Sequence, residues 1–124
     1  MSELRRDPVM GRWVIIAPER GLRPDPGPVV SNIRQPAPCV FCGGQEGRDP
    51  TEIYAVRSAG SSRNTPGWQV RVLPNKYPVL RIEGTLVREG IGMFDMMTGV
   101  GAHEVIVETP DHGKELADLG EGQI

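Results

Sequence analysis

Glycine and proline interrupt this sequence so often that a long helix has no room to form. The 124 residues include 16 glycines and 12 prolines. Proline cannot continue a helix or a central strand, and glycine raises the entropic cost of ordering either one. The chain is nevertheless long enough to bury a core without disulfide bonds. We therefore expect one domain made of short strands joined by many turns.

Short apolar or alternating runs mark the expected strands. Residues 103–109 alternate most clearly, with His103, Val105 and Val107 facing one way. The proline- and glycine-rich segment 21–38 reads as an extended loop, and the apolar spacing from Lys114 onward predicts the start of a helix. The other expected extended segments are 11–17, 52–56, 68–73 and 79–82.

Charge and hydropathy exclude several classes of protein. The net charge is −2, with 14 basic and 16 acidic residues, which disfavours a general nucleic-acid binder. No apolar run approaches the 18 residues of a membrane-spanning helix, so no membrane association is expected. The first eight residues lack the apolar stretch of a signal peptide. These features predict a cytoplasmic protein.

The arginines are concentrated near the N-terminus. Six of the twelve fall within the first 34 residues, against four acidic residues, and the whole chain has only two lysines. The rigid guanidinium fork of arginine suits bidentate binding of phosphate or carboxylate. Arg20 and Arg23 lie beside the proline- and glycine-rich loop, where ligands are commonly held. The alternative is a solvated or ion-paired surface.

Cys39 and Cys42 are the only cysteines, and their Cys-x-x-Cys spacing favours metal or redox chemistry in a cytosolic chain. One turn can present both thiolates to a single Zn²⁺ ion. A thioredoxin-like redox pair would open a helix, but Gly43 and Gly44 follow the cysteines here. We therefore favour a metal over a redox pair, with unligated buried thiols as the third alternative.

A closed zinc site needs four ligands, and the sequence offers only two histidines, His103 and His112. His112 lies in a turn beside Asp111, which could orient its ring; otherwise it is a solvated surface residue. Glu104 and Glu108 read as a solvated strand face rather than a catalytic pair. No phosphate loop, nucleophile elbow or His-Glu-x-x-His motif is present. The residues alone therefore indicate an anion- or phosphate-binding module with a zinc staple.

The order of these segments resembles the galactose-1-phosphate uridylyltransferases. The resemblance covers nearly the whole chain but only an N-terminal portion of a family member. It implies an α+β fold, mostly antiparallel sheet with Pro/Gly-rich loops and a C-terminal helix start, forming an incomplete histidine-triad-like domain over residues 1–124. The matching blocks are Arg6–Pro8, Arg12–Arg20 with Arg23–Pro24, Cys39–Cys42, Val72–Leu80 and Gly101–His112.

The resemblance also implies roles for individual residues. Cys39, Cys42 and His112 match three zinc ligands of many members. Arg20 and Arg23 fall where the family reaches a nucleotide phosphate, in some members across the dimer. The pair Asn75 and Lys76 falls where it contacts the nucleoside ribose, although the position of Lys76 is often acidic in members whose ribose contact is a carboxylate.

The implied activity is exchange of UMP between UDP-glucose and a hexose 1-phosphate through a uridylylated histidine, in a zinc-containing homodimer. The nucleophile of the family lies in a His-Pro-His-type motif, which this sequence lacks. We expect that histidine, and the fourth zinc ligand, beyond Ile124. The chain alone is then expected to form no stable nucleotidyl adduct with UDP-glucose. The alternatives are a related nucleotidyltransferase or phosphorylase, for example one acting on ADP-glucose, and a non-catalytic zinc-stapled nucleotide-binding module.

Overall fold

The computed structural model describes residues 1–24, 39–48 and 51–124. The chain forms two compact units, each assembled from two separate stretches of sequence. Unit 1 comprises Met1–Gly27 and Asn75–His103, and unit 2 comprises Pro28–Pro74 and Glu104–Ile124. Among the described residues, no helix is both long and apolar enough to cross a membrane. The loop expected over residues 21–38 lies mostly outside the described residues.

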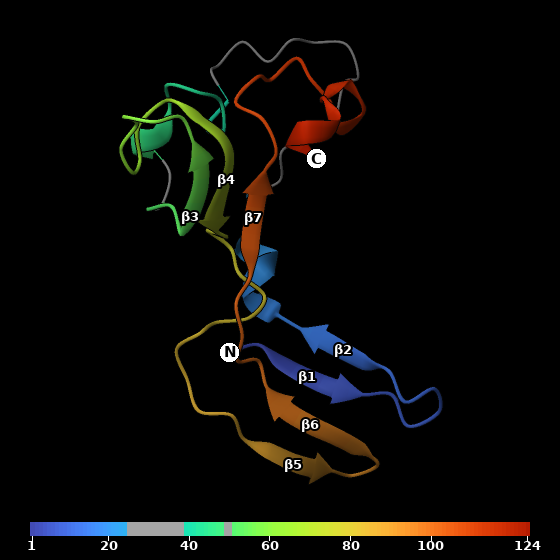
Figure 1. The fold of residues 1–124 in the computed structure, drawn as a ribbon. Coiled ribbons are helices and arrows are strands. Elements are labelled where there is room, and N and C mark those ends of the chain that lie inside the picture. The colour runs from blue at the N-terminus through green and yellow to red at the C-terminus, as the bar shows by residue number, and fades with distance from the viewer. Residues whose placement is uncertain (25–38, 49–50) are drawn as a thin grey trace. The chain divides into compact units, whose positions relative to one another are not determined.

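Unit 1 contains a four-stranded antiparallel sheet in the order β2-β1-β6-β5 (Figure 1). Two hairpins form it, and Gly92 supplies the left-handed backbone, at φ 61°, in the two-residue turn between β5 and β6. Met96 is the buried hydrophobic residue of this sheet. The strands are β1 (Glu3–Arg6), β2 (Trp13–Ile16), β5 (Arg88–Ile91) and β6 (Phe94–Thr98).

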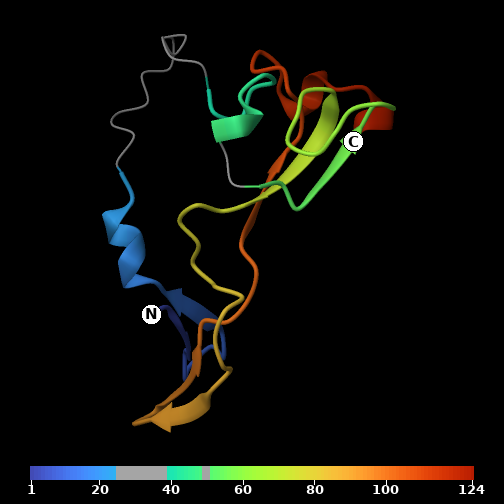
Figure 2. The same ribbon diagram turned by 90° about the vertical axis from the view of Figure 1, so that its left-hand side faces the viewer.

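Unit 2 contains a three-stranded antiparallel sheet in the order β3-β4-β7, whose strands lie side by side in both views (Figures 1 and 2). On β7, Val105 and Val107 are partly buried while Glu104 and Ile106 are exposed, as the alternating pattern predicted. The strands are β3 (Tyr54–Arg57), β4 (Trp68–Pro74) and β7 (Glu104–Val107).

A bulge in β4 changes which of its side chains are buried. Gln69 is an extra residue in the ladder, so Trp68 is buried along with Arg71 and Leu73, although simple alternation would separate them. The pairs flanking the bulge are Val56↔Val70 and Arg57↔Trp68.

Helical structure in the described residues is limited to short 3₁₀ helices: η1 (Pro18–Leu22), η2 (Glu46–Arg48), η3 (Leu116–Asp118) and η4 (Glu121–Gln123). The helix start predicted from Lys114 is therefore a pair of 3₁₀ turns. Gly120 lies between these turns and Gly122 within the second, and each glycine disfavours continuation into an α-helix. The predicted strand at 79–82 is reduced to one isolated bridge between Arg81 and Val100. The α+β class with mostly antiparallel sheet is confirmed.

Candidate functional site

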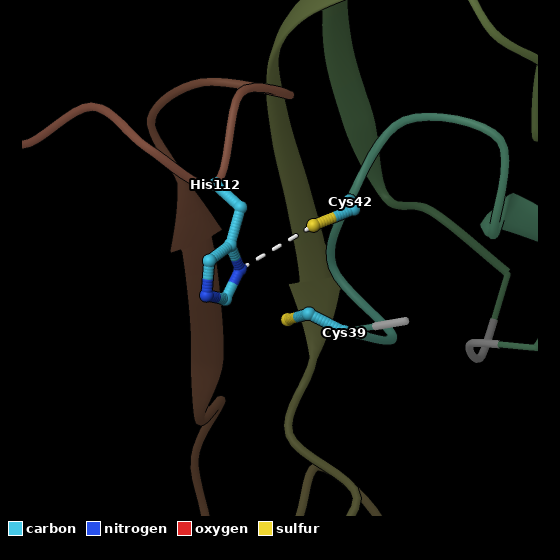
Figure 3. Close-up of side chains that lie close together, drawn as sticks. All are labelled: Cys39, Cys42 and His112. Carbon is cyan, nitrogen blue, oxygen red and sulfur yellow. Dashed lines mark hydrogen bonds between the residues drawn. The ribbon is translucent and has the colours of Figure 1, made fainter. Parts of the chain in front are cut away.

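Cys39 and Cys42 lie at the two ends of one tight turn in unit 2. The amide of Cys42 donates to the carbonyl of Cys39 over 3.0 Å, and the amide of Gln45 donates to the carbonyl of Cys42 over 3.2 Å. Both cysteines are half-buried, and neither forms a disulfide. The turn places the two sulfur atoms near each other (Figure 3). It does so without the helix that a thioredoxin-like pair requires.

His112 reaches this turn from the segment that follows β7 (Figure 3). The amide of Gly43 donates to the carbonyl of Pro110 over 3.2 Å and so joins the two segments. Glycine suits this position because a Cβ atom there would lie only 3.3 Å from the Cβ of Pro110. The carboxylate of Asp111 accepts the amide of Gly113 over 3.0 Å, which shapes the loop around the exposed imidazole. Local backbone contacts therefore bring His112 to the thiols.

The three side chains form a set of donors that fits a metal ion. The two sulfur atoms and the imidazole nitrogen lie within 4.8 Å of one another, and Cys42 Sγ is 3.4 Å from His112 Nδ1. Tetrahedral zinc with ordinary bond lengths would place a sulfur and a nitrogen ligand about 3.6 Å apart. A cavity of about 260 Å³ adjoins the three residues and leaves room for a further ligand.

The electrostatics at Cys42 argue against a reactive thiol. Burial raises the pKa of the Cys42 thiol, and the neighbouring Cys39 raises it further. A redox or nucleophilic cysteine requires the opposite shift. A bound cation would offset both effects, because thiolate is the form that ligates a metal.

Glu46 ties the cysteine turn to the sheet of unit 2. Its carboxylate accepts the indole N–H of Trp68 over 2.7 Å and the amide of Gly44 over 3.0 Å. Glu46 is only 4% exposed, and burial alone would raise its pKa, but these hydrogen bonds hold the pKa below its usual value. The carboxylate thus links β4 to the chain two residues after Cys42.

A second buried acid extends this polar network. Glu52, which is 3% exposed, accepts Arg71 Nε over 2.7 Å and forms an ion pair with Arg57. Burial alone would raise the pKa of Glu52, but the hydrogen bond from Arg71 and the charge of Arg57 hold it below its usual value. Arg71 is 1% exposed and also donates to the Glu46 carbonyl over 3.4 Å. This network is not predictable from the sequence, since the alternating pattern of β4 predicts that a polar residue at position 71 is solvated.

The predicted phosphate-binding arginines lie in unit 1. Arg20 is half-buried in η1, and Arg23 is exposed immediately after it. Neither guanidinium forms an ion pair with the described residues. Glu19 directly precedes Arg20 in the sequence and pairs with the N-terminal ammonium. The hydrogen bond from that ammonium lowers the pKa of the Glu19 carboxyl. Within the part of the chain that the structure describes, no carboxylate neutralises either guanidinium.

The predicted ribose-contacting residues also belong to unit 1. Asn75 is half-buried directly after β4 and lies against His103, while Lys76 is exposed with its ammonium 5.7 Å from the ring centre of Tyr77. The structure thus gathers the three predicted metal ligands in one unit, and the four predicted nucleotide-binding residues belong to the other.

Comparison with known proteins connects these features to a class of enzyme. No family model matches the chain. It is 35% identical over 123 residues to ADP-glucose phosphorylase from Arabidopsis thaliana, covering 94% of this chain and 33% of that protein. A solved uridylyltransferase structure is 26% identical with a TM-score of 0.58, covering 98% of this chain and 30% of the other. The structure of an ADP-glucose phosphorylase from Arabidopsis thaliana with bound ADP-glucose is 31% identical, with a TM-score of 0.47 and coverages of 96% and 32%.

The curated ADP-glucose phosphorylase and the uridylyltransferase structure indicate a nucleotidyltransferase-type class of protein. The chain is a homologue of ADP-glucose phosphorylase and of galactose-1-phosphate uridylyltransferase-like proteins, consistent with an N-terminal portion of that family, as the sequence motifs predicted. It spans about one third of the length of the relatives that it matches.

Proposed function

We propose that this chain is the N-terminal part of a zinc-containing enzyme that transfers a nucleotidyl group between a nucleotide sugar and a hexose 1-phosphate. The observation that carries the proposal is the convergence of Cys39, Cys42 and His112, three residues that the family resemblance names as metal ligands. Sequence identity of 35% to an ADP-glucose phosphorylase supports the same chemistry.

In this proposal the metal is zinc and its role is structural. Two thiolates and one imidazole are a donor set that zinc favours, and a closed site of this kind contributes directly to folding. Cys39 and Cys42 would hold the ion from one turn and His112 from another. The ion would thus staple the cysteine turn to the segment after β7, with the fourth ligand supplied from outside this chain.

The nucleotide-binding role falls to unit 1. Arg20 and Arg23 would neutralise phosphate charge, and positive charge near a transferring phosphoryl group also stabilises the transition state. Asn75 and Lys76 would donate to the ribose. The nucleophilic histidine is not part of this proposal for the 124 residues, because His112 faces Cys42 and the amide of Val79 donates to Nδ1 of His103.

Isothermal titration calorimetry with UDP-glucose and ADP-glucose tests nucleotide binding and decides which base is preferred. We expect Arg23→Gln to weaken binding, whereas Arg88→Gln, an exposed arginine on β5, serves as the matched control. Failure of the wild-type chain to bind either nucleotide sugar would contradict the proposal.

The substrate of the whole enzyme is a separate question from whether this chain carries the nucleophile, and the chain alone tests only the second. UDP-glucose with galactose 1-phosphate is the pair implied by the family resemblance, and the identity to an ADP-glucose phosphorylase favours ADP-glucose as the competitor. Intact-mass analysis after incubation with each nucleotide sugar should give no stable adduct on this chain. An adduct would show that His103 or His112 can act as the nucleophile.

The second candidate is a zinc-stapled module that binds nucleotides without catalysis. It is favoured by the contacts of the two histidines, since His112 lies against Cys42 and His103 accepts from the amide of Val79. It predicts nucleotide binding with near-stoichiometric zinc and no turnover by a homodimeric complete protein. Turnover by the complete protein would exclude it.

A further inference from the structure

Asn75 and His103 lie beside each other in unit 1, and the backbone amides of Tyr77 and Val79 determine how their side chains are oriented. The amide of Asn75 donates to the carbonyl of His103 over 2.9 Å, which holds the two residues side by side. Both side chains are half-buried. Asn75 Nδ2 lies 3.2 Å from His103 Nε2.

One amide fixes the orientation of the Asn75 side chain. The N–H of Tyr77 donates to Asn75 Oδ1 over 2.8 Å. The oxygen must therefore face Tyr77, because the reversed amide would bring two donors together there. It follows that Asn75 presents its NH₂ group to His103.

The other amide fixes the tautomer of His103. The N–H of Val79 donates to His103 Nδ1 over 3.0 Å, so Nδ1 carries a lone pair and no proton. A neutral imidazole has one protonated nitrogen, which must then be Nε2. The same tautomer leaves Nε2 without the lone pair that a metal ligand or a nucleophile requires.

Two hydrogen-bond donors therefore meet, and neither can accept from the other. Among the described residues, no other side chain or carbonyl accepts from Asn75 Nδ2 or His103 Nε2. A single oxygen atom beside both groups would satisfy both donors.

We propose that Asn75 Nδ2 and His103 Nε2 donate together to one oxygen of a bound nucleotide, which makes His103 a second binding residue beside Asn75. This inference rests on the nucleotide binding proposed above. The oxygen belongs to a ribose hydroxyl or to a phosphate, both of which accept hydrogen bonds.

Two substitutions separate binding from folding at position 103. His103→Asn keeps an acceptor near the Nδ1 position for the amide of Val79 but removes the distal donor. His103→Gln keeps a distal donor and removes the proximal acceptor. We expect His103→Asn to keep the melting temperature of the wild type and to lose affinity, whereas His103→Gln should lose stability and keep more of the affinity.

Calorimetric titrations with AMP and UMP measure the effect on the wild-type chain and both variants. The His103→Asn variant should bind about three- to tenfold more weakly than the wild type if it loses a hydrogen bond to a hydroxyl. If the lost hydrogen bond goes to a charged phosphate, its affinity should fall by about tenfold or more. The 2′,3′-dideoxy nucleotides and the free nucleosides locate the oxygen. A ribose contact predicts that the variant and the wild type bind the dideoxy compounds equally, and a phosphate contact predicts the same for the nucleosides.

Nitrogen-15 NMR of the imidazole reads the tautomer without any ligand. We expect Nε2 to be protonated and Nδ1 to be unprotonated. The chemical shift of the Nε2 proton should change when nucleotide is added. The opposite tautomer, or equal affinity of wild type and His103→Asn for both nucleotides, overturns the shared acceptor alone. A wild-type chain that binds neither AMP nor UMP refutes the proposed nucleotide-binding function as well.

Discussion

Replacing Arg71 with methionine should destabilise unit 2 strongly although Arg71 lies outside the predicted site. The guanidinium is 1% exposed and its Nε lies 2.7 Å from Glu52 Oε2. The variant Arg71→Met keeps much of the aliphatic volume but leaves the Glu52 carboxylate buried at 3% exposure with one cation fewer. Removing one partner of a buried ion pair typically costs about 3–5 kcal/mol.

The lower end of that range applies because Arg57 still pairs with Glu52. We expect a loss of about 3 kcal/mol in the free energy of unfolding, or about 10 °C in melting temperature for a chain of this size. Urea unfolding followed by circular dichroism measures the first quantity and a thermal scan the second. The matched control is Arg5→Met, which removes an exposed pair with Glu3 and should cost less than about 1 kcal/mol.

The pH dependence of the stability difference between Arg71→Met and the wild type tests whether the unpaired Glu52 carboxylate causes the loss. Since the pKa of Glu52 in the folded chain lies below its ordinary value of 4.5, its stabilisation is present above that pH and is lost as the pH falls through the folded pKa. Arg71→Met should therefore approach the wild type in stability as the pH falls from 7 to below 4.5, because protonation removes the unpaired buried charge. Equal stability of Arg71→Met and Arg5→Met at pH 7 would refute the reasoning.

Three further predictions concern the cysteine turn. Cys39→Ser should lower zinc content and melting temperature together, as should chelation of the wild type, measured by elemental analysis and thermal scans; full loss of zinc with unchanged melting temperature would contradict a structural role. Gly43→Ala should cost about 1 kcal/mol, because its Cβ would lie 3.3 Å from that of Pro110, while Gly47→Ala, with open space around it, should have little effect on unfolding in urea. The lowered pKa of Glu46 predicts that the contribution of its carboxylate is present above pH 4.5 and is lost as the pH falls through the folded pKa, which acid titration of Glu46→Gln against wild type should show as a shrinking difference.

The strands that were both predicted from the sequence and found in the structure have an alternating apolar pattern or a run of β-branched residues. Trp13–Ile16, Trp68–Pro74 and Glu104–Val107 all formed within or close to the predicted ranges. The strands Glu3–Arg6 and Phe94–Thr98 were missed because charged or mixed residues fill them and their pairing with each other, rather than local pattern, makes them strands.

The convergence of Cys39, Cys42 and His112 was predictable because spacing and motif order carry that information. Two cysteines three residues apart need only a turn to converge, and the resemblance identified His112, which lies 70 residues beyond Cys42. The burial of Arg71 was not predictable, since one extra residue at Gln69 reverses the faces of β4 and no local signal marks the bulge. The pairing of Asn75 with His103 likewise depends on a long-range contact.

The two halves of the candidate metal centre are held by one sheet, and this makes metal binding sensitive to distant residues. Glu46 fastens the cysteine turn to Trp68 on β4, and the segment bearing His112 continues from β7, which pairs with β4. A change that loosens the register of β4 should therefore separate the thiols from the imidazole. We infer that Arg71→Met will bind zinc more weakly than Arg5→Met, although neither arginine touches the ion's ligands.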